Sequence, residues 1–259
     1  MQQGTNDERW ALSRRSVVRG AAWTVPVVAV AATAPAYAAS PCDLRTGAVL
    51  DWDGASTTYS YAPDRRTATA SFDPDGAGPV PPMTMTVSTS YAGGMKPGNE
   101  TSLDQAMFVR SSVGGLGVSG LTLEQATTST GPRYRADRGS YTFTFSRPVS
   151  NLTFTVTDID SLNGDFWDVL EPSPGYTVVS TGAQVSSDFG GPNGSQRFYS
   201  SNNNNPQNDT NSDLGNVQLR YAGPISSFTL TYWNAQTSFT VDTSQAIWVS
   251  DMTFDYKPC

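Results

Sequence analysis

The densest group of residues that could bind a metal ion lies between residues 158 and 168. Four aspartates and one asparagine occur in this stretch: Asp158, Asp160, Asn163, Asp165 and Asp168. Calcium takes about six to eight oxygen ligands, largely carboxylates and carbonyls, and these side chains supply most of that number. We therefore predict Ca²⁺ as a cofactor here. The alternative is a solvated turn, because Asp and Asn tolerate tight backbone geometry.

Aromatic side chains form a second candidate site. Trp167, Tyr199 and Trp233, with Trp52 as a further candidate, could stack on the apolar face of a sugar. Trp233 follows Tyr232 in an alternating segment, so one of this pair should face away from the core. The alternative is that these rings are core residues, which is common for large aromatic side chains.

Composition excludes several classes of function. The chain of 259 residues contains no histidine, which rules out Ser-His-Asp and Cys-His catalysis and His-ligated metal sites. The net charge of −7 predicts that nucleic acid is not a partner, because nucleic-acid binding needs a basic face. A glycan or a cell-envelope component is the predicted partner instead. Paired carboxylates can hydrolyse glycans without histidine, but no pair stands out in the sequence.

The first 38 residues have the pattern of an export signal. Arg14 and Arg15 precede a modestly apolar run at 20–34, and Ala36 and Ala38 form a small-x-small cleavage site. This pattern resembles the twin-arginine signal of bacterial proteins that are exported already folded. A general secretion signal is the alternative. Either route predicts an extracellular domain, 39–259, with no membrane contact once the signal is removed.

Two cysteines stand at opposite ends of this predicted domain. Cys42 follows the predicted cleavage site, and Cys259 is the last residue of the sequence. An even number of cysteines in an exported chain predicts a disulfide, with two free thiols as the alternative. A bridge requires Cα atoms within about 7 Å. The first and last strands should therefore be neighbours or face each other.

Strict alternation of apolar and polar residues runs through the chain. Five segments show it, namely 83–87, 141–145, 152–156, 217–221 and 228–232. This period of two is typical of half-buried antiparallel strands, and glycine and proline mark the turns between them. The pattern predicts an all-β, jelly-roll-like antiparallel sandwich in a single domain. The Asn-rich segment 200–213 is too polar to bury and is predicted to be a surface loop.

The last alternating segment, 246–256, contains Asp251 between apolar residues. Either one phase runs throughout, or Ile247 and Val249 join the core and a bulge at Ser250–Asp251 switches the phase before Met252. This apolar–Asp–apolar ending resembles the final strand of jelly-roll carbohydrate-binding modules and related bacterial surface domains. That resemblance implies a structural calcium with Asp251 as a ligand.

These observations together predict a secreted, non-catalytic surface module with a binding or structural role, stabilised by calcium. Two alternatives stay open at this point. One is a carbohydrate-binding module proper, and the other is a carboxylate-based glycan hydrolase. Fold class by itself does not decide among the three, because function depends on the site.

Overall fold

The computed structural model describes residues 42–74, 80–98, 105–127, 134–207, 209–237 and 244–259. The predicted export signal, 1–38, with Arg14, Arg15, Ala36 and Ala38, lies outside these residues. The described strands belong to one compact unit, Pro41–Cys259. Within them, no helix is long and apolar enough to cross a membrane. Apart from the 3-10 turn η1 (Pro192–Gly194), the regular elements are strands.

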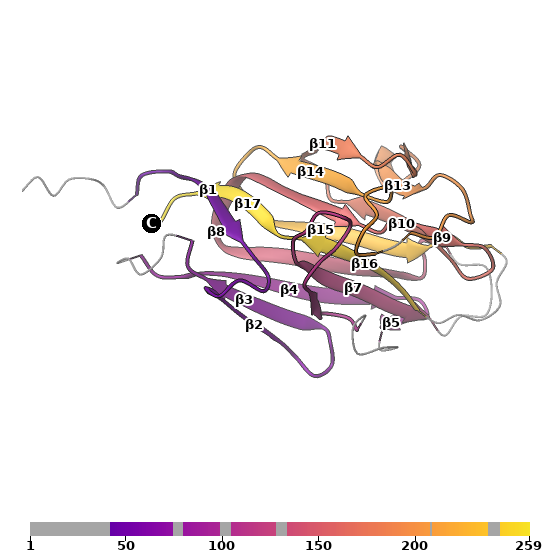
Figure 1. Cartoon of the computed structure of the whole chain (residues 1–259), viewed down its shortest axis with the longest axis horizontal. Helices are drawn as coiled ribbons and strands as arrows, with labels where there is room; N and C mark the ends of the chain where they lie inside the picture. The colour runs from indigo at the N-terminus through magenta and orange to yellow at the C-terminus, as the bar shows by residue number, and fades with distance from the viewer. Residues whose placement is uncertain (1–41, 75–79, 99–104, 128–133, 208, 238–243) are drawn as a thin grey trace, which may run out of the picture. The chain divides into compact units, whose positions relative to one another are not determined.

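Strand β8 (Arg138–Thr157) runs through both layers of the fold (Figure 1). Its first half pairs with β4 and β15, and its second half pairs with β14, β16 and β17. Between the halves, Pro148 lacks a backbone N–H, and the pairing with β15 shifts register between Val149 and Thr144. The strand can therefore bend here and carry the chain from one layer into the other.

The first layer contains eight antiparallel strands. Their order is β2 (Thr57–Tyr61), β3 (Thr67–Phe72), β4 (Met83–Ala92), the first half of β8, β15 (Ile225–Asn234), β10 (Phe166–Pro172), β13 (Arg197–Ser200) and β12 (Val185–Asp188). The short β9 (Ser161–Leu162) pairs with the start of β10.

The second layer is built around the other half of β8. One side of that half carries β14 (Val217–Tyr221) and then β11 (Tyr176–Thr181). The other side carries β16 (Ser244–Ser250) and β17 (Met252–Tyr256). β16 pairs onward with β7 (Gly120–Thr127), which β5 (Met95–Pro97) and β6 (Val109–Arg110) border, and β17 pairs with β1 (Arg45–Leu50).

Aromatic rings from both layers meet in the core. Phe154 of the second layer stacks on Phe228 of the first at 4.8 Å between ring centroids, and Phe145 lies 5.6 Å from Phe254. The apolar positions of all five alternating segments are buried. The structure therefore confirms the predicted all-β antiparallel sandwich.

The final segment follows the second of the two predicted phases. Ile247 and Val249 of β16 and Met252 of β17 are all fully buried. Asp251 separates the two strands and switches the phase between them. The bulge thus lets apolar residues on both sides of Asp251 reach the same core.

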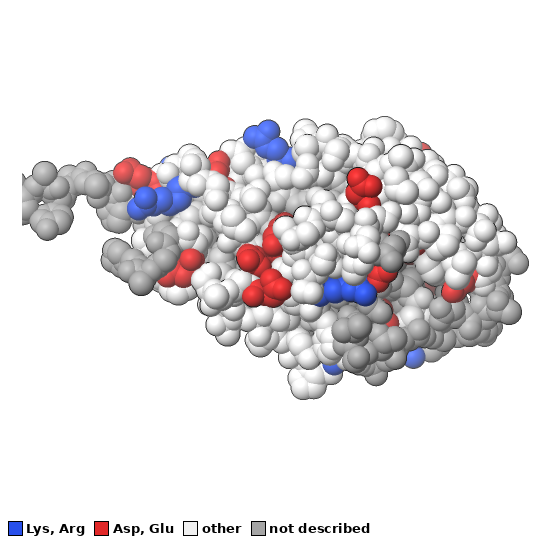
Figure 2. All heavy atoms as spheres, in the orientation of Figure 1, with Lys and Arg blue, Asp and Glu red and all other residues white. Residues whose placement is uncertain are grey.

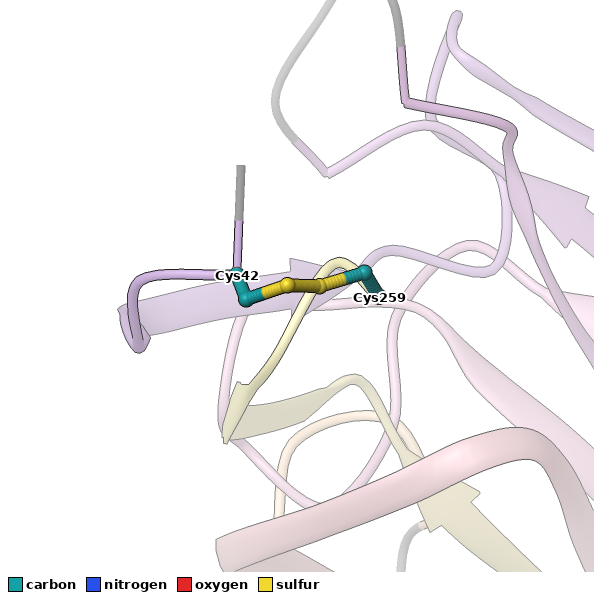
Figure 3. Close-up of a disulfide and its surroundings, with 2 residues drawn as sticks. All are labelled: Cys42 and Cys259. Carbon is teal, nitrogen blue, oxygen red and sulfur yellow. A yellow bond between two sulfur atoms is a disulfide. The ribbon is translucent and has the colours of Figure 1, made fainter. Parts of the chain in front are cut away.

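The two cysteines form a disulfide, and β1 lies beside β17 (Figures 1 and 3). The Cα atoms of Cys42 and Cys259 are 5.1 Å apart, within the range that a bridge requires. The predicted pairing and the predicted proximity of the first and last strands are both confirmed.

Replacing both cysteines with serine should lower the free energy of unfolding. The bond joins residues separated by 217 positions, and the chain-entropy model gives about 5 kcal/mol for a loop of that length. Urea denaturation followed by tryptophan fluorescence measures the change, and reduced wild-type protein should match the double variant. Equal urea midpoints for oxidised and reduced wild type would contradict the prediction.

Candidate functional site

A recess of about 270 Å³ lies where β7 and β16 extend past the end of β8. β8 pairs with β16 at Trp248 and Val249, whereas the first residues of β16 pair with β7 alone. The lining combines carboxylates from three separate parts of the chain with aromatic and amide side chains: Glu124, Asp158, Asp160, Asp209, Phe166, Gln245 and Trp248. The recess therefore brings together residues that are far apart in the sequence.

A tight reversal after β8 turns Asp160 into this recess. Asp158 adopts a left-handed backbone conformation (φ 66°), which aspartate tolerates better than most residues. The next residue, Ile159, donates its N–H to the carbonyl of Gly215. A Cβ at Gly215 would lie 3.0 Å from the Ile159 nitrogen, so glycine permits this close approach. Asp160 is left only 4% exposed.

Asp160 and Asp168 form a buried acid pair. The backbone N–H of Asp160 donates to Asp168 Oδ2 at 3.3 Å, and the Tyr232 hydroxyl donates to Asp168 Oδ1 at 2.6 Å. Burial raises the pKa of Asp160 to about 7. Burial and then the neighbouring Asp160 raise the pKa of Asp168 well above its ordinary value. Both carboxyls therefore keep their protons to a higher pH than an ordinary aspartate does.

The Asn-rich segment is at the surface, as predicted, and closes one side of the recess. The N–H of Gln207 donates to Asp160 Oδ2 at 2.6 Å, and the N–H of Asn205 donates to the Ser161 carbonyl at 2.8 Å. Asp209 pairs with Arg110, whose guanidinium carbon lies 5.1 Å from the Trp248 ring centroid. These contacts hold the segment against the sandwich.

Two buried side chains that line the recess keep polar atoms without hydrogen bonds. Gln245 is 6% exposed and Trp248 is 3% exposed. Neither the amide group of Gln245 nor the indole N–H of Trp248 has a partner among the residues that the structure describes. A buried polar group without a partner is unfavourable by about 1–3 kcal/mol. A ligand that bonds to both groups would recover this free energy.

A second, larger hollow of about 630 Å³ is internally satisfied. Arg135 donates to both carboxylate oxygens of Glu171 at 2.7 and 3.1 Å, and Ser195 donates to the same carboxylate at 2.9 Å. The charged groups of this hollow already pair with each other. The smaller recess is therefore the better candidate for a ligand site, despite its smaller volume.

The predicted calcium ligands are brought together only in part. Asp160 and Asp168 are in contact, but Asn163 is exposed, with its N–H 3.5 Å from Asn204 Oδ1. Asp251 lies in another group, where it accepts hydrogen bonds from the Ser119 hydroxyl and the Trp52 N–H. Across the described ranges, no three acidic or cysteine side chains are arranged to hold a metal ion. Calcium binding stays a prediction of the sequence.

Asp158 borders the same acid pair, whereas Asp165 does not line the recess. Asp158 lines the recess and contributes to the raised pKa of Asp168. Asp165 lies in a turn, with its N–H bonded to the Leu162 carbonyl and its own carbonyl accepting from the Asn234 amide.

The aromatic candidates do not form an exposed stacking surface. Trp233 lies outside the hydrophobic core that contains Tyr232, but it is buried all the same, because Arg135 covers its ring at 5.8 Å. Trp52 is also buried and donates its indole N–H to the Ser250 carbonyl. Trp167 is half-buried, with its indole N–H bonded to the carbonyl of Ser200, and Tyr199 is half-buried on β13.

Most residues that line the recess were not selected from the sequence, among them Glu124, Gln245 and Trp248. Glu124 had a detectable signal, because it stands next to the apolar residues Leu121 and Leu123 in the sequence; in the structure it is 1% exposed on β7. Gln245 and Trp248 had none, because their role depends on the relative lengths of β8 and β16.

Comparisons with known proteins give one structural likeness. No protein family and no curated protein matches this chain. Among solved structures, the chain is similar to the adhesin domain of PrgB from Enterococcus faecalis bound to DNA. The sequences are 11% identical, the TM-score is 0.40, and the match covers 76% of this chain and 70% of the other. This likeness assigns no ligand to the present chain.

The DNA-bound neighbour corrects the partner prediction, which excluded nucleic acid and named a glycan or cell-envelope component. The exclusion was wrong because it used the charge of the whole chain, whereas a ligand meets only a local surface. On the face drawn in Figure 2, acidic side chains lie in separate groups among neutral residues. Net charge therefore does not describe any one part of this surface.

Replacing Asp160 with Asn should stabilise the protein increasingly as pH rises. The folded-state pKa of about 7 exceeds the ordinary value, so the folded protein keeps a proton that the unfolded chain releases between about pH 4 and 7. The stability supplied by this carboxyl is complete below that window and is lost as pH rises through it. Thermal unfolding by circular dichroism should show the Tm difference, variant minus wild type, growing from pH 4 to 8.

The matched control for this experiment is Asp64→Asn, because Asp64 is exposed. Its Tm difference from wild type should stay nearly constant over the same range. A Tm difference for Asp160→Asn that does not change with pH would contradict the raised pKa.

Proposed function

We propose that the chain is an exported, non-catalytic binding module and that the recess at the end of β8 is its ligand site. The observation that carries the proposal is the pair of buried, unpartnered polar groups on Gln245 and Trp248 in the described structure. Native interiors satisfy nearly all such groups. Two at one recess are explained by a ligand that completes their hydrogen bonds.

The scaffold supports a binding role. The recess is built at the ends of paired strands, and strands hold side chains more rigidly than loops do. The Cys42–Cys259 bond joins the two ends of the described chain. Disulfides persist in oxidising compartments, which supports an extracellular location.

The chemistry of the acid pair supports a non-catalytic role. Asp168 is 1% exposed and its Oδ1 accepts the Tyr232 hydroxyl, so this carboxyl does not reach the recess itself. The sequence contains no histidine that could act as a base in its place. Binding without turnover is the simpler role for such a site.

Filling the recess should abolish binding. Ala246 lines it, and Ala246→Phe places a ring there while leaving Gln245 and Trp248 intact. Saturation-transfer NMR with a panel of small amines, carboxylates, amides and alcohols should identify compounds that bind wild type but not this variant. The control, Val179→Phe, alters an exposed residue of β11 and should bind normally. A panel without any binder, or one that binds Ala246→Phe equally, would contradict the proposal.

Export is tested separately with the full chain expressed in a bacterium that has both export routes. The secreted product should begin at Ala39, and Arg14→Lys combined with Arg15→Lys should retain the precursor inside the cell. Export of that double variant would favour the general secretion route. Uncleaved wild-type chain confined to the cytoplasm would reject the extracellular location.

A further inference from the structure

The geometry points to an alkylammonium group, carried by a small molecule or by a long side chain, as the ligand of this recess. This inference rests on the proposed function, since it names the chemistry of the same site. A volume of about 270 Å³ is near the lower end of the range for small-molecule pockets, which begins at about 300 Å³. The recess therefore suits a short ligand or one inserted side chain.

Charge decides the sign of the ligand. Asp160 is 4% exposed and Asp168 is 1% exposed, and no basic side chain of the described residues forms an ion pair with either. Buried acids without a countercharge favour a cation and disfavour an anion. Because Asp160 lines the recess, an ammonium group there can reach its carboxyl.

The unpartnered groups define the hydrogen bonds that the ligand makes. The Gln245 amide oxygen can accept a second N–H from the ammonium group. The Trp248 indole can donate to an oxygen elsewhere on the ligand, because indole is a donor only. Phe166 and Ala246 give an apolar wall for the methylene groups between these two ends. The lining thus fits a chain with an amine at one end and an acceptor at the other.

An organic cation fits this lining better than a metal ion. Calcium needs about six to eight oxygens around one point. No three carboxylates converge in that way among the residues described. One organic cation already contacts lining residues of the recess, because the Arg110 guanidinium pairs with Asp209 and lies over the Trp248 ring. An ammonium group would repeat this arrangement at Asp160.

Three probes that differ at one end test the inference on the purified full chain. They are 5-amino-1-pentanol, 1,5-pentanediol and 5-hydroxypentanoate, which end in an ammonium, a hydroxyl and a carboxylate. Saturation-transfer NMR and isothermal titration at constant ionic strength compare their binding, with calcium chloride as a fourth arm. We expect the amine to bind and the other two probes to bind at least about tenfold more weakly.

Variants place the binding at the recess. Asp160→Asn should weaken amine binding by about tenfold or more, because it removes the charged acceptor. Gln245→Leu should weaken it by a smaller factor, and the exposed Asp64→Asn should leave it unchanged. Thermal unfolding verifies that each variant is folded. Equal loss in Asp64→Asn would show that the effect is general charge attraction and would overturn the inference.

The outcomes separate this inference from the proposed function. Binding of the diol or the carboxylate in place of the amine, abolished by Ala246→Phe, would overturn the ammonium ligand and leave the binding site intact. Calcium binding that Asp160→Asn removes, with no amine binding, would also overturn it in favour of a metal ion. Amine binding that Ala246→Phe and Asp160→Asn both leave unchanged would overturn the ammonium site and count against the recess.

Discussion

Strand β8 is the element on which the rest of the structure depends, because its two halves belong to opposite layers. The alternation of its side chains changes phase between the halves, because the buried residues Tyr141, Phe143 and Phe145 have odd numbers whereas Leu152, Phe154 and Val156 have even numbers. Within either half, a shift of one residue would turn the buried rings outward, since side chains repeat every two residues. The stacking of Phe154 on Phe228 across the layers fixes this register. The change of register between Thr144 and Val149 marks the border between the two layers.

The recess is a consequence of that geometry. The second half of β8 ends at Thr157, opposite Trp248, whereas β16 begins four residues earlier at Ser244. The first turn of chain after β8 fills part of the remaining edge and carries Asp158 and Asp160 with it. A mismatch in strand length thus produces a polar site at the border of an apolar core.

The sequence contains most of the information about the fold and much less about the site. Alternation at 141–145 and 152–156 identifies buried positions directly, because burial on one face imposes a period of two. The phase change at Asp251 was one of two possibilities, and the core packing of Met252 decides between them. Cys42 and Cys259 could be paired because they were the only candidates.

Contacts between distant segments account for what the sequence did not reveal. Trp233 alternates with Tyr232 and lies outside the core, yet Arg135 covers its ring and removes it from solvent. Asp251 is the same type of residue as the aspartates of the 158–168 cluster. It nevertheless lies in a separate group, with different hydrogen-bond partners. Local composition identifies possible ligands, whereas only the tertiary structure determines which of them meet.

The polar groups at the recess are better explained by binding than by folding. A buried acid pair without a basic partner contributes little to stability, and apolar replacements of similar size are often neutral or stabilising. The unpartnered atoms of Gln245 and Trp248 are unfavourable for the same reason. These unfavourable features occur together beside one recess, while the larger hollow near Glu171 satisfies its own charges. A ligand site would place these groups side by side, because one ligand can offset the free-energy cost of all of them.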